Sequence, residues 1–193
     1  MNICVFSSSS NAIAEHYFEE ARVLGELIGK NGHTLVNGGA NVGLMEASTL
    51  AVAQTGAKTI GVMPERLIKR SLVSDYSHKV IVTKDMQERK SRMRGLADVF
   101  IALPGGFGTL EEILEVLTLK QLSYHNKAIV FINTNNFFEH LLKQFELSYT
   151  ESFAKEQYKK LYYVADNAHA AIKYIEEYKP AQLDLQWFKV PGR

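Results

Sequence analysis

The sequence has little cysteine and no long apolar run. Its single cysteine, Cys4, excludes an internal disulfide. Cys4 lies between Ile3 and Val5, and a free cysteine in such an apolar run is usually a small core residue. We therefore expect a buried structural thiol rather than a nucleophile. No apolar run approaches the ~20 residues that cross a bilayer, and no signal peptide is recognisable. We expect a cytoplasmic protein with no membrane partner.

Net charge is also nearly absent. Lys and Arg together number 22 and Asp and Glu 21, which leaves a net charge of +1. This balance disfavours bulk binding to nucleic acid or to acidic membranes, whereas a small phosphorylated ligand needs only a local positive site. A chain of 193 residues with 46% hydrophobic residues suits one globular domain. We expect that domain over residues 1–180, followed by a C-terminal tail over 181–193.

Short apolar segments alternate with longer amphipathic segments along the chain. Strands are predicted over 2–7, 33–36, 58–63, 79–82, 98–103, 127–132 and 161–164. Helices are predicted over 12–30, 43–55, 84–95, 110–122, 135–148 and 167–178, with an irregular connection over 64–78. The apolar runs are continuous, as in strands covered on both faces. The pattern predicts an α/β fold, a doubly wound parallel sheet in three layers, with a ligand cleft at the carboxyl ends of the strands.

Two glycine-rich segments, Gly38–Gly39 and Gly105–Gly108, each follow a predicted strand. Such loops offer backbone N–H groups to a phosphate at a helix N-terminus. Neither loop is a dinucleotide fingerprint, because Ala40 and Glu111 replace required glycines, and no Walker A Gly-Lys-Ser/Thr is present. A nicotinamide cofactor and a P-loop ATPase are thus disfavoured. A single loop of this kind is explained equally well as a tight turn that serves only the fold. Two such loops at the same edge of the sheet favour a ligand site.

Two polar clusters have simple structural explanations. The basic stretch from Met86 to Arg94 has helical spacing, and composition alone favours a solvated helix face. Thr109 and Glu112 fit the capping box Thr-x-x-Glu, in which Thr109 caps a helix and Glu112 reaches back to its amide. From spacing alone, the capping box is the simpler account of Glu112.

Together, these segments resemble the Lonely Guy family. Residues 104–112, Pro-Gly-Gly-Phe-Gly-Thr-Leu-Glu-Glu, are similar to its Pro-Gly-Gly-x-Gly-Thr-x-x-Glu signature. Residues 86–90, Met-Gln-Glu-Arg-Lys, are similar to its Met-x-x-Arg-Lys element. The first glycine loop and the opening strand are also similar, so the likeness spans roughly residues 2–122. The rest resembles the family mainly in its strand–helix pattern.

The resemblance implies a modified Rossmann fold, usually a homodimer, that needs no metal or redox cofactor. The family hydrolyses cytokinin riboside 5′-monophosphates, and some bacterial relatives act on AMP, giving free base and ribose 5-phosphate. Arg89 and Glu112 are the implied catalytic pair. The residues expected to hold the nucleoside 5′-monophosphate are Ser8, Gly38, Gly39, Met86, Lys90, Gly105, Gly106, Phe107, Gly108, Thr109, Glu111 and Thr118.

The chemistry suits the implied pair. Breaking an N-glycosidic bond builds positive charge on the ribose, which a carboxylate at Glu112 stabilises, or Glu112 orients the attacking water. Arg89 either holds the phosphate or counters charge on the departing base, and the residue types leave both roles open. The chain departs from the family pattern at Ser7, Asn37, Ala40, Glu46 and Gln87. These departures leave the pair intact but make AMP or another purine monophosphate a better supported substrate than a cytokinin.

The sequence also bears on two other functions. Proteins of similar fold carry the molybdenum cofactor, and the same glycine loops would hold such a ligand without turnover. The joint presence of Arg89, Lys90 and Glu112 favours an enzyme. A lysine decarboxylase is disfavoured, because no lysine has a recognisable pyridoxal-phosphate context. The predicted helix 110–122 is apolar on several sides, so it either meets a partner subunit or is buried in its own core.

Overall fold

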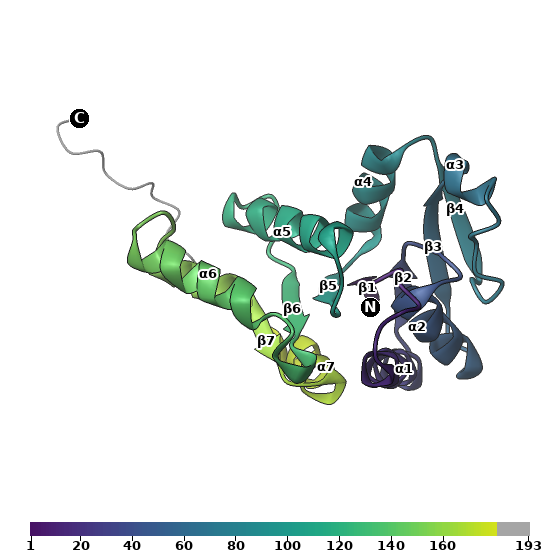
Figure 1. Ribbon diagram of the computed structural model, residues 1–193, viewed down its shortest axis with the longest axis horizontal. Helices are drawn as coiled ribbons and strands as arrows, with labels where there is room; N and C mark the ends of the chain where they lie inside the picture. Colours follow the sequence, from purple (N-terminus) through teal and green to yellow (C-terminus); the bar gives the residue numbers. More distant parts are fainter. Residues whose placement is uncertain (181–193) are drawn as a thin grey trace.

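A computed structural model describes residues 1–180 as one seven-stranded parallel sheet flanked by helices, in the order β4-β3-β2-β1-β5-β6-β7 (Figure 1). The strands are β1 (Asn2–Phe6), β2 (Thr34–Asn37), β3 (Thr59–Pro64), β4 (Lys79–Thr83), β5 (Val99–Ala102), β6 (Ala128–Ile132) and β7 (Tyr163–Ala165). The helices are α1 (Glu15–Lys30), α2 (Gly43–Gln54), α3 (Glu65–Ile68), α4 (Met86–Leu96), α5 (Phe107–Gln121), α6 (Glu139–Thr150) and α7 (Ala168–Glu177), with 3₁₀ turns η1 (Thr134–Asn136) and η2 (Glu156–Leu161). The predicted α/β fold with a doubly wound parallel sheet is confirmed.

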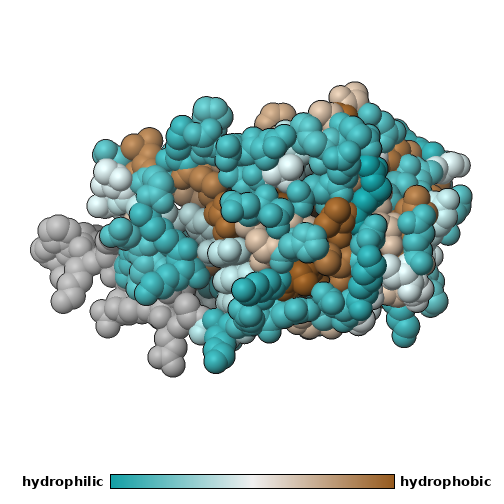
Figure 2. Space-filling view, turned by 90° about the horizontal axis from the view of Figure 1, so that it is seen from below, coloured by the Kyte–Doolittle hydropathy of each residue, from teal (hydrophilic) through white to brown (hydrophobic). Residues whose placement is uncertain are grey.

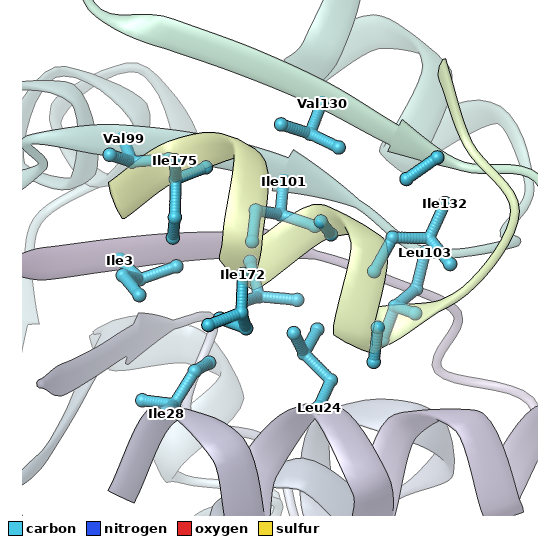
Figure 3. Packing of buried hydrophobic residues seen from close by; sticks show 14 of the residues in the cluster. Ile3, Leu24, Ile28, Val99, Ile101, Leu103, Val130, Ile132, Ile172 and Ile175 are labelled. Atoms are coloured by element: carbon cyan, nitrogen blue, oxygen red, sulfur yellow. The ribbon is translucent and has the colours of Figure 1, made fainter. Parts of the chain in front are cut away.

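The sheet forms the middle of three layers because its central strands are apolar on both faces. All residues of β5 and β6 are buried. Helices α1, α2 and α7 cover one face, and Figure 3 shows Leu24 and Ile28 of α1 and Ile172 of α7 meeting Ile3 and Ile101 of the strands. Helices α4, α5 and α6 cover the other face. Each fully buried Leu or Ile of this kind contributes about 1.5–3 kcal/mol of transfer free energy.

Cys4 is fully buried in β1, and burial raises the pKa of its thiol. The prediction of an inert core thiol is therefore confirmed, since a buried thiol stays protonated and unreactive.

Among residues 1–180, no helix is both long and apolar enough to cross a membrane. On the lower side of the molecule as drawn in Figure 1, hydrophobic residues gather in the middle of a mainly hydrophilic surface, as Figure 2 shows.

Several predicted element boundaries were wrong. Helix α5 begins at Phe107, three residues before the predicted start, because Gly106 has extended backbone and serves as N-cap. The connection over 64–78 contains the short helix α3. The predicted helix 135–148 starts later than expected, because Asn135 and Asn136 at the end of η1 have positive φ and α6 begins only at Glu139. The predicted tail over 181–193 lies outside the described residues.

The strand order reverses between β1 and β5. Strands β2, β3 and β4 follow one another on one side of β1, and β5, β6 and β7 on the other. The loops that leave the carboxyl ends of β1 and β5 therefore diverge to opposite faces of the sheet, which opens a crevice between them. The two predicted glycine loops both lie at this edge, after β2 and after β5.

Candidate functional site

A cleft of about 170 Å³ lies at this carboxyl edge, on the side of α4 and α5. Its lining comes from the loop after β1, the first glycine loop, and helices α2, α4 and α5. The lining residues are Val5, Phe6, Ser7, Ser9, Gly38, Met45, Met86, Arg89, Met93, Gly108, Thr109, Glu111 and Glu112. The lining thus combines apolar side chains with polar and charged ones, and the charged groups come from α4 and α5. Polar groups that converge beside apolar side chains are typical of a small-molecule site.

Arg89 and Glu112 form an ion pair inside the cleft. Arg89 Nη1 donates to Glu112 Oε1 at 2.6 Å, and each residue is 8% exposed. Arg89 Nε donates to the Val62 carbonyl at 3.1 Å, which fixes the guanidinium against the end of β3. Arg89 Nη2 makes no hydrogen bond to another of residues 1–180. The pair is therefore held in place from two sides, and the Nη2 amino group of Arg89 remains available to a ligand.

The start of α4 places Arg89. Asp85 is the N-cap residue, and its side chain accepts a hydrogen bond from the Glu88 amide at 2.8 Å. The Glu88 carboxylate in turn accepts from the Lys84 amide at 3.0 Å. Such reciprocal capping fixes where a helix begins. Arg89 follows directly in the first turn, and its side chain is buried. The alternative of a solvated basic face is therefore wrong for Arg89, although Arg92 on the same helix is exposed.

Gly38 makes room for the guanidinium. A Cβ atom at Gly38 would overlap Arg89 Nη2 and lie 2.9 Å from Met45 Sδ. Gly39 has a φ of +70°, a left-handed conformation that glycine adopts without strain, and its Cα packs against the backbone of Gly61 in β3. Gly38 thus lines the cleft, whereas Gly39 joins the loop to the sheet.

Burial perturbs the protonation of Glu112. Loss of water raises the pKa of its carboxyl above the ordinary value of 4.5, and the Arg89 guanidinium opposes part of that shift. The role predicted by the capping-box alternative is wrong, because Gly106 caps α5 without a side-chain hydrogen bond and Glu112 binds Arg89 instead. A carboxyl with a raised pKa beside a fixed cation in a cleft is typical of a functional site.

Lys90 lies beside this pair but has its own partners. It forms ion pairs with Glu111 and, at 3.5 Å, with Glu115. The hydrogen bond that Lys90 donates to the Glu111 carboxylate is the main reason why the pKa of Lys90 is raised. Arg94 also binds Glu115, at 2.7 Å. The result is a charged rim that ties α4 to α5 and so holds Arg89 and Glu112 in register.

The second glycine loop leads directly into α5. A Cβ atom at Gly105 would overlap the Thr109 side chain and lie 3.1 Å from the Ser8 amide nitrogen, so this loop packs closely against its neighbours. Gly106 and Gly108 instead face open space, with no heavy atom within 4 Å of an added Cβ. The first N–H groups of a helix have no intrahelical acceptor. The open glycines therefore leave these donors accessible to an anion, one helical turn before Glu112.

The structure does not bring all the sequence-predicted site residues to the cleft. Met86 is half-exposed at the cleft, and Phe107, 91% exposed, stands at the start of α5 without lining it. Ser8 lines a neighbouring pocket. Thr118 lies near the other end of α5, donates to the Leu114 carbonyl and lines a separate pocket beside α6. Within one chain, Thr118 is therefore remote from Arg89 and Glu112.

Sequence reasoning missed the apolar and backbone part of the site. Met45 and Met93 line the cleft from α2 and α4, and the Val62 carbonyl binds Arg89. A backbone carbonyl leaves no signal in the sequence. The Asp85-x-x-Glu88 capping pattern was visible and would have placed Arg89 in a first helical turn. Among residues 1–180, no group of three or more His, Cys, Asp or Glu side chains is arranged to hold a metal ion.

Comparisons with solved structures agree with this architecture. The molybdenum cofactor binding protein from Rippkaea orientalis superposes with a TM-score of 0.71 and 27% identity, covering 91% of this chain and 94% of that one. The molybdenum cofactor carrier protein from Chlamydomonas reinhardtii gives a TM-score of 0.70 and 25% identity over 91% of this chain and 96% of its own.

Sequence comparisons give the family. A family model described as "Possible lysine decarboxylase" matches residues 45–175. The cytokinin riboside 5′-monophosphate phosphoribohydrolase LOG7 of Arabidopsis thaliana is 38% identical over 92% of this chain and 82% of its own length. The enzyme LOG of Oryza sativa subsp. japonica is 36% identical over 96% of this chain and 77% of its own. The family model spans the second glycine loop and the Arg89–Glu112 pair, and the two relatives match almost the whole chain. The chain therefore belongs to the Lonely Guy family of phosphoribohydrolases.

Proposed function

We propose that this protein hydrolyses the N-glycosidic bond of purine nucleoside 5′-monophosphates, releasing free base and ribose 5-phosphate. The observation that carries this proposal is the buried Arg89–Glu112 pair, one helical turn from the open glycines at the start of α5. A phosphate bound at these amides would place the sugar over the pair. Relatives named for this reaction support the same assignment.

Each half of the pair has a distinct task in this reaction. The Glu112 carboxylate faces the positive charge that develops on the ribose as the bond breaks, and it accepts a proton from the attacking water. Arg89 holds that carboxylate in place through Nη1. Its Nη2 group, which no other of residues 1–180 binds, is free to donate to the departing base or to the phosphate. Energy from phosphate binding positions the reacting bond, which favours monophosphates over nucleosides.

Product formation tests the proposal directly. AMP and isopentenyladenosine monophosphate are supplied in parallel, and free base and ribose 5-phosphate are both quantified. We expect turnover of at least one substrate, lost on Glu112→Gln, and the ratio of kcat/KM values ranks AMP against the cytokinin precursor. Release of base in the Glu112→Gln variant at the wild-type rate would disprove the assigned role. Ligand binding without turnover by the wild type would favour the second candidate, a carrier like the structurally similar molybdenum cofactor proteins.

The pH dependence of kcat provides an independent prediction. Glu112 works as a carboxylate, so kcat falls as the pH drops through its pKa. Since burial raises that pKa above 4.5, the acid limb should lie above the value of an exposed glutamate. We expect a single-proton acid limb that lies above pH 4.5, on the alkaline side of the limb of an exposed glutamate. An activity that stayed constant down to pH 4 would contradict this role.

We further propose that the enzyme is a homodimer in which Thr118 acts on the partner's nucleotide. The resemblance assigns Thr118 to the substrate, yet within one chain it lines a different pocket from Arg89 and Glu112. A Thr118 side chain that contacts the nucleotide bound by the partner subunit is consistent with both observations. The surface around Thr118 also includes Leu117 and Phe145, which suits a partner subunit.

Mixed dimers test this arrangement. Inactive Glu112→Gln and weakened Thr118→Ala chains, co-refolded or co-expressed with different tags, would form hybrids with one intact composite site. We expect hybrid activity well above that of either parent homodimer, approaching half the wild-type rate. A monomer in analytical ultracentrifugation at micromolar concentration would overturn the dimer, and a Thr118→Ala homodimer with wild-type KM would overturn the role in trans.

A further inference from the structure

A second cavity lies at the same sheet edge as the catalytic cleft, and the proposed mechanism does not use it. This cavity has a volume of about 190 Å³ and is lined by Ser8, Ile13, Tyr17, Pro104, Gly105, Gly106 and Phe137. We propose that it is a second binding subsite, for a flat uncharged ring of nucleobase type. The choice of a nucleobase rests on the proposed function, because that reaction releases a free base.

The lining explains the preference for a flat ring without charge. Tyr17 of α1 and Phe137, in the loop after β6, meet edge to face, with ring centroids 5.9 Å apart and an angle of 80° between their planes. A planar ligand can stack on one of these rings while its edge meets the face of the other, which is the favourable geometry for aromatic groups. Ile13 and Pro104 complete an apolar wall, and no charged side chain lines the cavity. Buried without a partner, a charged ligand would lose its hydration here.

Backbone strain supports a specific role for the Phe137 loop. Asn135 and Asn136 have φ values of 51° and 58°, so two successive non-glycine residues adopt the left-handed conformation immediately before Phe137. Residues with a Cβ atom adopt this conformation less readily than glycine, although asparagine tolerates it better than most. The Asn133 side chain holds the next turn in place by accepting from the Phe138 amide at 2.7 Å. This loop keeps the Phe137 ring 42% exposed at the cavity, although the neighbouring Phe138 is buried.

The second glycine loop forms the wall between the cavity and the cleft. Gly105 packs against Thr109 on the cleft side and approaches the Ser8 amide on the cavity side. A ring in the cavity therefore lies across this loop from Arg89 and Glu112 and does not need the catalytic pair. Since Gly106 lines the cavity and is also the N-cap residue of α5, a ligand in the cavity lies beside the proposed phosphate-binding loop.

Fluorescence titration with 2-aminopurine, a fluorescent purine base, tests the subsite without requiring turnover. We expect saturable quenching by wild-type protein, competition by adenine, and binding at least about tenfold weaker in Phe137→Ala and in Tyr17→Ala, since each removes one aromatic wall. Phe153→Ala is the matched control, because it deletes a phenyl ring that is 85% exposed and does not line the cavity. Circular dichroism and thermal melts identify variants that fail to fold.

A cleft variant separates the two sites. Met86→Ala removes an exposed side chain that lines the cleft but not the cavity, and it should leave 2-aminopurine binding unchanged. Loss of binding in Met86→Ala with normal binding in Phe137→Ala would place the ring in the cleft and overturn the subsite. Absence of quenching by the wild type would overturn it too. Because the assay measures binding of a free base, a protein inactive on nucleotides would disprove the proposed function and leave this result standing.

Discussion

Replacing Arg89 by alanine is expected to abolish hydrolysis and to lower the free energy of unfolding by about 3 kcal/mol, the low end for a broken buried ion pair because the cleft admits water. The substitution leaves the Glu112 carboxylate buried without its cation. It also leaves the Val62 carbonyl without the Arg89 Nε donor. Urea denaturation and product assays on the same preparation measure both effects.

The stability deficit should depend on pH with a defined sign. In the wild type, burial already raises the pKa of Glu112, and Arg89 is the group that most opposes this. Without Arg89 the pKa rises further, so the folded state binds a proton more tightly than the unfolded state. The deficit is then full above the folded pKa, shrinks as the pH falls through it, and is smallest below pH 4.5, where the carboxyl is protonated in both states. A deficit that grew on acidification would contradict this explanation.

A double variant separates stability from catalysis. Arg89→Met with Glu112→Leu removes both charges and keeps apolar volume in a cleft that already contains Met45 and Met93. Replacing a buried ion pair by apolar groups is often neutral for stability. We therefore expect the double variant to unfold near the wild-type urea midpoint while remaining inactive. If it were as unstable as Arg89→Ala, the pair would matter mainly through packing or through the bond to Val62.

The general architecture was predictable because it follows from hydrophobic pattern. The continuous apolar runs of β1, β5 and β6 require cover on both faces, and helices between them supply it. The position of the cleft followed from parallel strands with loops at their carboxyl ends. Boundaries were less predictable where glycine decides them. The extended backbone of Gly106 moves the start of α5 to Phe107, and this shift turns Thr109 from a cap into an interior residue.

The site was predictable only in part. The resemblance to family motifs pointed to Arg89 and Glu112, but the sequence could not show that they bind each other across two helices. The Thr-x-x-Glu spacing made a capping box the simpler account of Glu112, because local partners are visible in a sequence and tertiary partners are not. The Val62 carbonyl and the Gly38 gap depend on how β3 and β2 lie beside α4, which only the folded chain reveals.

Gly38→Ala is expected to lower kcat/KM by about 100-fold, because displacing a catalytic group by about 1 Å can have that effect. The added methyl group would overlap Arg89 Nη2, and Met45 Sδ at 2.9 Å restricts its escape on the other side. The guanidinium must therefore move away from the cleft wall, which disturbs its bond to Glu112. The end of the Arg89 side chain can move to make room for the methyl group. The free energy of unfolding should therefore fall by much less than in Arg89→Ala.

Gly95→Ala is the matched control for this prediction. It makes the same substitution in α4, the helix that carries Arg89, at an exposed position with no heavy atom within 4 Å of the new Cβ. Because alanine favours helix over glycine, this variant should be more stable by about 0.5–1 kcal/mol and fully active. Steady-state kinetics with the preferred nucleotide and thermal melts measure both variants. If Gly38→Ala and Gly95→Ala had equal kcat/KM, the fit between Gly38 and Arg89 would have no catalytic importance. A loss confined to Gly38→Ala would show that the first glycine loop serves catalysis by leaving space for the guanidinium.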